Sequence, residues 1–192
     1  MIYNILYYIV MELNNKWTLY LHYKDLGKFY NDNLEKIIDI TDIETFWRTF
    51  NNIPKIYEIF SDGISIKKLK RTNATPCAYS FFKDDIFPCW EDPKNKDGFE
   101  YSIKNSIDLK KLHNEWMECI IKLIGNKDSI MYHINGIRMV DCTKYTSVLY
   151  RMEIWVDNEK YRTEIEDFIK NEFNLGEYKL LYRAHKNIKE TI

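Results

Sequence analysis

The tripeptide Trp90-Glu91-Asp92 combines residue types that could bind a flat, positively charged ring. The indole of Trp90 offers a π-face that attracts a cation. The carboxylate of Glu91 could accept the N1 and N2 hydrogens of guanine in a bidentate, charge-assisted pair, a pattern that adenine and the pyrimidines cannot present. The stretch lies between Pro88 and Gly98, in a predicted loop, where functional residues are common. These neighbours predict a site for a cationic purine such as N7-methylated guanine.

A second aromatic ring would close the stack, and Tyr30 is the candidate. It stands at the end of the turn 24–30, which follows the strand-like alternation of residues 16–23. Two aromatic faces can sandwich one base, and a methyl group at N7 makes guanine positive, so that cation–π attraction adds to stacking. The alternative is that Tyr30 only packs within the protein, as aromatic residues in strands and turns often do.

A set of different short motifs is spread over most of the chain. They are Leu13 to Trp17, Asn33 to Ile37, Phe46-Trp47, Phe82 to Asp92, Asn95-Lys96 with Gly98, Trp116 to Cys119, Leu123 to Gly125 and Ile154-Trp155. With several tryptophans in register, the set resembles the eukaryotic translation initiation factor 4E, or mRNA cap-binding, family. The resemblance implies that Tyr30, Trp90 and Glu91 bind the 7-methylguanosine cap of mRNA. Most relatives have Trp where Tyr30 stands, and the smaller ring still stacks.

The resemblance also implies contacts to the methyl group and the phosphates of the cap. Trp155 resembles the residue that touches the N7 methyl group, with a core tryptophan as the alternative. Arg151 matches a phosphate-binding lysine of the family. Residues 135–144 depart from the family pattern, so that Arg138 and Lys144 are both candidates for a further phosphate contact. The alternative for both is a solvated charge on a hairpin.

A second candidate surface lies on two predicted helices, where apolar i,i+4 pairs fall outside the expected core positions. The set is Ile43, Trp47, Met117, Glu118, Ile121 and Gly125. It resembles the convex-side patch where the family binds the scaffold initiation factor 4G and its mimics, which dock a short helix. We therefore expect a factor 4G-like partner. The alternative is that both stripes are core, because helices that cover a sheet often have wide apolar faces.

The composition fits one compact domain over residues 1–192. A chain with 45% hydrophobic residues can bury one core of this size. The net charge of -1 argues against a protein that coats nucleic acid, because such proteins rely on a large basic excess. Residues 1–12 are expected to form an apolar arm too short to span a bilayer. The segment 54–78 is longer than is typical of the family and contains a basic cluster at 67–71.

The residues do not predict catalysis, a cofactor or a metal site. The four cysteines lie far apart without a CxxC pair, which fits free thiols, and the four histidines have no evident nucleophile or metal partner. We expect a monomer without membrane contact, in the cytoplasm, or in the host cytoplasm if the source is a virus.

Two alternatives to a cap-binding initiation factor remain. One is a cap-sequestering repressor. The other is a cap-processing nucleotide hydrolase, for which the carboxylates at 84–85 and 91–92 would be a weak metal-binding cluster.

The hydrophobic periodicity predicts an α+β fold, a curved and mainly antiparallel β-sheet with three helices packed on its convex face. Strands are expected at 16–23, 34–40, 79–82, 130–140, 147–156 and 178–184. A capping box formed by Thr41 and Glu44 predicts a helix through Asn52. Further helices are expected at 109–124, with Gly125 as the stop, and at 159–173.

Overall fold

A computed structural model describes residues 11–24, 29–65, 67–69, 73–105, 108–144, 147–173 and 178–187. In these residues seven strands form one sheet, in the order β2-β1-β3-β5-β6-β4-β7. All neighbouring strands are antiparallel. The strands are β1 (Glu12–Tyr23), β2 (Leu34–Asp42), β3 (Pro76–Lys83), β4 (Phe99–Asn105), β5 (Ile134–Asp141), β6 (Tyr150–Val156) and β7 (Leu181–Ala184).

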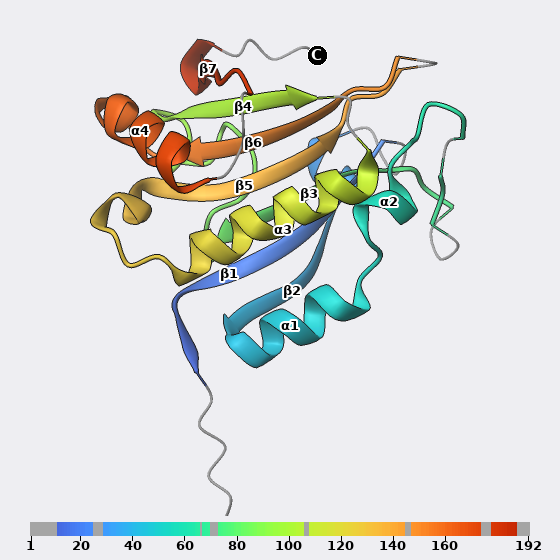
Figure 1. Ribbon diagram of the computed structural model, residues 1–192, viewed down its shortest axis with the longest axis horizontal. Helices are drawn as coiled ribbons and strands as arrows, with labels where there is room; N and C mark the ends of the chain where they lie inside the picture. Colours follow the sequence, from blue (N-terminus) through green and yellow to red (C-terminus); the bar gives the residue numbers. More distant parts are fainter. Residues whose placement is uncertain are drawn as a thin grey trace, which may run out of the picture.

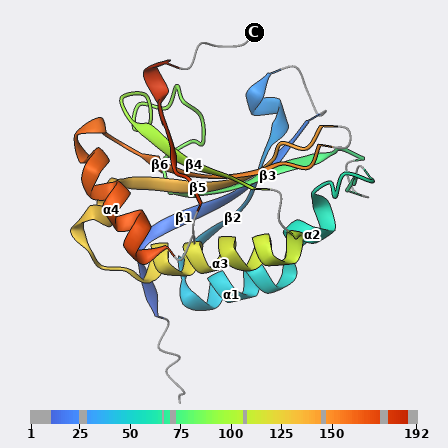
Figure 2. The ribbon, with the colours of Figure 1, turned by 45° about the horizontal axis from the view of Figure 1, so that its top comes forward.

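The helices lie on one face of this curved sheet, its convex face. They are α1 (Ile43–Asn52), the short α2 (Ile56–Ile59), α3 (Leu109–Gly125) and α4 (Arg162–Glu172). Helices α1 and α3 run side by side below the sheet. Helix α4 lies toward the side of the sheet formed by β6 and β4 (Figures 1 and 2). A hydrogen bond of 2.8 Å from the Tyr101 hydroxyl on β4 to Glu166 fastens α4 to that edge.

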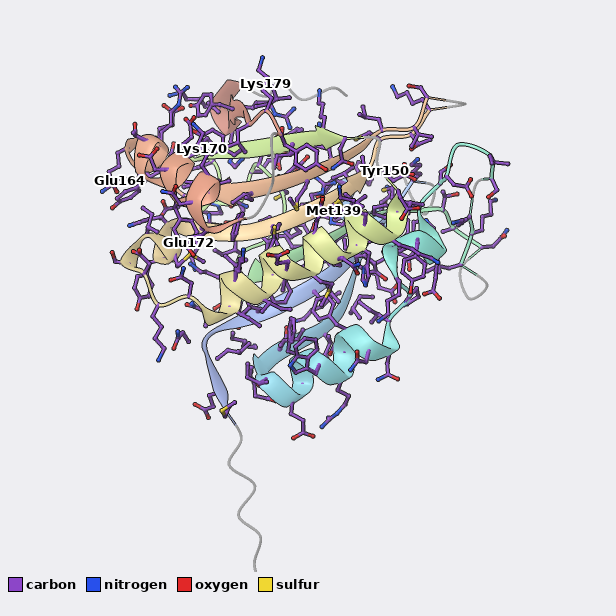
Figure 3. The ribbon with its side chains drawn as sticks, viewed as in Figure 1. Met139, Tyr150, Glu164, Lys170, Glu172 and Lys179 are labelled. Carbon is purple, nitrogen blue, oxygen red and sulfur yellow. The ribbon has the colours of Figure 1, made fainter. Side chains whose placement is uncertain are left out.

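The core fills the space between the helices and the convex face. Because side chains alternate along a strand, every second residue of each central strand points to this face. Phe81 on β3 stacks on Trp17 of β1 with ring centroids 4.9 Å apart, and Phe50 of α1 meets its ring edge-on at 6.0 Å. Met139 and Tyr150, buried on β5 and β6, lie on the same side as α3 (Figure 3).

The concave face carries the other half of the alternation and is largely polar, apart from Phe82 and Trp155. Its side chains include His22, Ser80, Glu100, Ser102, Arg138, Arg151, Glu153 and Arg183. Opposite charges stand directly across from one another, since Arg138 is paired in register with Glu153 and Glu100 with Arg183. This face therefore has the chemistry to bind a charged ligand, whereas the convex face does not.

The predicted fold class is confirmed, with several local corrections. Asp42, rather than Thr41, caps α1, because its carboxylate accepts the backbone N–H of Thr45 at 2.7 Å. Gly125 is the last residue of α3 instead of its stop, and Asn126 caps the helix in an extended conformation. The helix predicted at 159–173 begins as a 3₁₀ turn and becomes α-helical three residues later.

Strand β4 and helix α2 were missed by the sequence reading. The alternation of Phe99, Tyr101 and Ile103 was the available signal for β4, and these three side chains are buried in the core. The predicted N-terminal arm falls mostly on residues 1–10, which lie outside the described residues. Part of the basic cluster at 67–71 also lies outside them. Of its described members, Lys67 donates to the carbonyl of Tyr57 at 2.7 Å.

No helix in the described residues is both long and apolar enough to cross a membrane.

Gly136 leaves no room for a side chain at the centre of the sheet. A Cβ atom at this position would lie 2.4 Å from Cγ of Phe82 and 2.8 Å from the carbonyl oxygen of Phe81. We predict that Gly136→Ala lowers the free energy of unfolding by about 1–3 kcal/mol, because an overpacked core must shift. Gly125→Ala is the matched control, with no atom within 4 Å of the new Cβ and a gain of up to about 1 kcal/mol in helix propensity. Urea unfolding of both variants measures the two effects. A free energy of unfolding of Gly136→Ala equal to that of the wild type would contradict the prediction.

Glu100 on the concave face titrates far from its ordinary range. Burial, and then the neighbouring carboxylate of Glu153, raise the pKa of Glu100 from 4.5 to about 7, although Arg183 Nη2 lies 2.8 Å from its Oε1. The folded state thus keeps a proton that the unfolded chain releases near pH 4.5. The stability from this proton is complete below that pH and is lost as the pH rises through about 7.

We predict that Glu100→Gln removes this pH dependence. Between about pH 5 and pH 7.5, the wild-type protein should lose on the order of 2 kcal/mol of unfolding free energy relative to the variant. Urea unfolding at both pH values measures the difference. Glu164→Gln, which removes an exposed carboxylate of α4 (Figure 3), is the control and should follow the wild type. Parallel pH profiles for wild type and Glu100→Gln would contradict the assignment.

Candidate functional site

The loop between β3 and β4 holds Trp90 in place through one buried side chain, Asn95. Its Nδ2 donates to the carbonyls of Phe87 and Cys89, each at 2.9 Å. Its Oδ1 accepts from Nδ2 of Asn135 on β5 at 2.9 Å. The loop is therefore closed on itself and fastened to the sheet on both sides of Trp90, so that the indole does not depend on loose backbone for its position.

The two carboxylates that follow Trp90 have different tasks. Asp92 is structural, because its carboxylate accepts the backbone N–H groups of Phe87 and Lys94, each at 2.8 Å. Glu91 is exposed at the outside of the turn. Burial and a hydrogen bond with Glu91 raise the pKa of the Cys89 thiol to about 11, so that the thiol stays protonated at neutral pH. Of the two acids, Glu91 is the one in a position to meet a ligand.

Trp90 stands at the rim of a small aromatic cluster on the concave face. It is half-buried and packs against Phe82, Ile86 and Trp155. The guanidinium carbon of Arg183 lies 5.5 Å from the centroid of the Trp90 ring, so a cation already occupies the space over this π-system. The Trp90 Nε1–H is buried and has no hydrogen-bond partner in the described residues. The ring is thus firmly supported and electronically suited to a cation.

Tyr30 is tied to the Trp90 loop by its hydroxyl. That hydroxyl donates to the carbonyl of Pro88 at 2.5 Å and lies 3.4 Å from Nδ1 of His22, whose Nε2 is hydrogen-bonded to Ser80 at 2.8 Å. Burial of the hydroxyl raises the pKa of Tyr30 to about 12, yet 42% of the residue's surface stays exposed. The structure therefore links the segment that carries Tyr30 to the loop that carries Trp90, while the Tyr30 ring itself meets His22 and Phe87 edge-on. A Trp in place of Tyr30 would lack this hydroxyl.

The predicted phosphate ligands are not equivalent. Arg151 and Arg138 both reach the buried carboxylate of Glu153, with closest nitrogen–oxygen distances of 2.5 Å and 3.9 Å. Each keeps a small part of its side chain exposed. Lys144 is exposed beyond the end of β5, in a bridge to Ser147. The first two form one charged cluster on the floor of the concave face, and within the described residues Lys144 forms no ion pair with that cluster.

Trp155 is buried and belongs to this floor. Its Nε1 donates to Glu153 Oε2 at 2.9 Å, its ring meets Phe82 edge-on at 5.4 Å, and His185 lies 4.6 Å from its centroid. The free protein thus has Trp155 behind Trp90 instead of open to solvent. Contact between Trp155 and a ligand stays a prediction, and it requires neighbouring side chains to make room.

The second predicted surface is partly open. Trp47 and Ile121 expose 45% and 40% of their surface, which excludes the core alternative for these two side chains. The remaining members are half-buried or exposed, and they are Ile43, Met117, Glu118 and Gly125. Helices α1 and α3, which carry all six, lie side by side on the convex face (Figure 2). An apolar patch with a tryptophan at its centre is typical of a protein contact.

The sequence reading missed the residues that hold the site together. Asn95 belongs to one of the short motifs, but the motif does not predict that its side chain closes the loop, and Asn135 gave no signal because its partners lie 40 and 41 residues away in the chain. Glu100, Glu153 and Arg183 were hidden as single charges within strands. The signal that could have found them is a charge at the alternate positions of otherwise apolar strands. In the described residues, no group of three or more His, Cys, Asp or Glu side chains could hold a metal ion.

Comparison with known proteins gives the family. Residues 12–191 match the family described as eukaryotic initiation factor 4E. The chain is 33% identical over 117 residues to translation initiation factor 4E-1B of Danio rerio, covering 59% of this chain and 47% of that protein. It is 32% identical over 121 residues to the human factor 4E, covering 62% and 49%. The chain thus spans about half the length of the curated relatives it matches.

Solved structures share the fold. An Ascaris suum eIF4E-3 in complex with an m7G cap superimposes with a TM-score of 0.73 at 19% identity, covering 96% of this chain and 97% of that one. A C. elegans eIF4E-3, in complex with the 4E-binding protein Mextli and a cap analog, gives 0.72 at 21% identity, covering 92% and 94%. With the family match extending over nearly the whole described chain, this protein belongs to the eukaryotic initiation factor 4E family.

Proposed function

We propose that this protein binds the 7-methylguanosine cap of mRNA on its concave face and recruits a scaffold factor through its convex face. The observation that carries the proposal is the hydrogen bond of the Tyr30 hydroxyl to the carbonyl of Pro88, which links the segment that carries Tyr30 to the loop that carries Trp90. The relatives are named translation initiation factors, and two structural neighbours were solved with a cap or cap analog. The protein would act by binding, without a chemical step, in the cytoplasm where capped mRNA is translated.

The cap would be recognised through three kinds of interaction. A methylated base between Tyr30 and Trp90 gains stacking and cation–π attraction. The exposed carboxylate of Glu91 can then accept the N1 and N2 hydrogens of guanine. The phosphates would meet Arg151 and Arg138, whose guanidinium groups are pre-positioned by Glu153.

The convex patch supports recruitment over mere sequestration of the cap. Trp47 on α1 and Ile121 on α3 are large and exposed, and the two helices lie side by side. A partner helix that presents apolar residues one turn apart could cover both. Glu118, which forms an exposed ion pair with Lys122 at 3.0 Å, borders the patch and could favour a basic residue in the partner. A protein that only sequesters the cap would not need a surface that recruits a scaffold factor.

We predict that 7-methylguanosine triphosphate binds at least about tenfold more tightly than guanosine triphosphate, because cation–π attraction adds on the order of 1–2 kcal/mol. Trp90→Ala should lower the affinity for the methylated ligand by about 1–3 kcal/mol, the usual loss of a stacking platform. Isothermal titration calorimetry with both ligands measures the two effects.

Trp47→Ala is the matched control, since it also removes a half-exposed tryptophan but from the opposite face. It should leave the affinity for the methylated nucleotide unchanged. Equal affinity of the wild-type protein for the two nucleotides would refute cap recognition. Capped RNA recovered from the incubation should be intact, and release of a nucleotide would favour the hydrolase alternative instead.

We predict for the convex face that Trp47→Ala weakens binding of a scaffold peptide by at least about 2 kcal/mol, as expected for a central tryptophan anchor. The probe is a helical peptide with a tyrosine, four intervening residues, a leucine and another hydrophobic residue. Peptide retained on cap resin loaded with each variant gives the comparison.

In this experiment Trp90→Ala becomes the control, and its peptide binding, measured in solution, should equal that of the wild type. A melting curve of Trp47→Ala separates loss of a contact from loss of the fold. If the variant melts much lower and still binds the peptide, the ring is structural and the proposed partner surface is wrong.

A further inference from the structure

Glu153 is a fully buried carboxylate whose two oxygens serve two different partners. Its Oε2 accepts the indole N–H of Trp155 at 2.9 Å, and its Oε1 lies 2.5 Å from Arg151 Nη2. Arg138 approaches from the neighbouring strand, with Nη1 at 3.9 Å from Oε2. The side chain of Glu153 is 0% exposed, so its carboxylate makes these contacts away from solvent. One acid therefore links an aromatic ring to two guanidinium groups.

The position of this link follows from the strand. Because side chains alternate along a strand, residues 151, 153 and 155 of β6 all point to the same face. A cation, an anion and an indole therefore follow one another along the strand, spaced about 7 Å apart. Trp155 packs in the same cluster as Trp90, the stacking ring of the proposed site. The other end of the row, Arg151, is the proposed phosphate ligand. The row thus runs from the base side of the site to its phosphate side.

The surroundings of the link are not saturated with hydrogen bonds. Six buried side-chain atoms around this floor have no hydrogen-bond partner in the described residues, and they are Trp90 Nε1, Glu100 Oε2, Arg138 Nε, Arg151 Nε, His185 Nε2 and Glu153 Oε1, whose contact with Arg151 is an ion pair. Orphaned buried polar atoms are rare in folded proteins, and such a group usually points to a missing water or ligand. Their concentration here leaves the floor with polar groups that could still bind water or a polar ligand.

A buried charge is an expensive way to pack a sheet. An apolar side chain at this position would commonly be as stable as a buried ion pair or more so. The carboxylate does provide what an apolar side chain cannot, since it fixes the ring plane of Trp155 through the N–H and sets a negative potential beside the aromatic cluster. That potential favours a positively charged ring near Trp90 and Trp155, and it limits how strongly the guanidinium groups attract phosphate alone.

We propose that Glu153 is a specificity-determining positioning residue, which makes the site prefer a ligand that carries a cationic ring together with phosphates over one that carries phosphates alone. The proposal rests on the proposed cap-binding function of the same site. Without the negative charge, Arg151 and Arg138 would attract any nucleotide phosphate more strongly. At the same time the aromatic cluster would lose part of its attraction for a methylated base. Both changes reduce discrimination between the two nucleotides.

The test is the affinity ratio of 7-methylguanosine triphosphate to guanosine triphosphate, measured by calorimetry at one salt concentration. Glu153→Gln keeps an oxygen acceptor for the Trp155 N–H and removes the charge, and it should lower the ratio about fivefold or more. Unmethylated nucleotide should bind as tightly as before or more tightly. Glu164→Gln, an equal loss of charge on the exposed side of α4, is the control and should leave the ratio unchanged.

Trp155→Phe provides a second route, because it keeps an aromatic ring and removes the N–H that Glu153 holds. It should also lower the ratio, and the double variant should fall little below the lower single variant, as expected for residues that act as a unit. An unchanged ratio in folded Glu153→Gln, or fully additive effects, would overturn the proposal. If melting curves show that Glu153→Gln does not fold, an unchanged ratio in Trp155→Phe alone overturns it. A wild-type protein that prefers neither nucleotide would instead refute the proposed function.

Discussion

Alternation along antiparallel strands is the constraint on which the rest of this structure depends. Each strand shows one set of side chains to the helices and the other set to the concave face. Phe81 and Trp17 stack on the convex side, whereas Arg138 and Glu153 meet on the other. A shift of one residue in any central strand would exchange the two sets, placing charges in the core and core side chains on the concave face. Core and site are therefore specified by the same register.

The site is assembled by connections that cross this sheet. Asn95 closes the loop that carries Trp90 and fastens it to Asn135 on β5. The hydroxyl of Tyr30 joins the other aromatic wall to the same loop. Both links are hydrogen bonds to backbone or amide groups in places where water is excluded, so each would leave an unpaired polar group if broken. A binding site on loops is in this way given the rigidity of the sheet beneath it.

The charged floor shows how stability and function oppose each other. Two buried carboxylates lie close enough that Glu153 helps to raise the pKa of Glu100 to about 7, and three arginines surround them. Such a network stabilises a sheet less than apolar packing would. It fits a surface that has to hold a base and a phosphate chain of opposite charge next to each other. The apolar convex face, with Trp47 exposed, fits a partner protein instead.

The sequence by itself determined the fold class, six of the seven strands at their approximate positions, and the three longer helices with their core residues, because hydrophobic periodicity is local. It also determined the family, since tryptophans spaced over the whole chain fall in one register. It placed Trp90 and Glu91 in a loop from neighbouring prolines and glycine. It did not reveal β4 as read, although Phe99, Tyr101 and Ile103 alternate there with Glu100 and Ser102 as in a half-buried strand. Nor did it reveal which charges pair, because Arg138 meets Glu153, and Tyr30 meets Pro88, only after residues far apart in the chain are brought together. Those contacts, and the burial that changes the chemistry of Glu100 and Trp155, were decided by the tertiary structure, because hydrogen-bond partners and desolvation depend on neighbours in space.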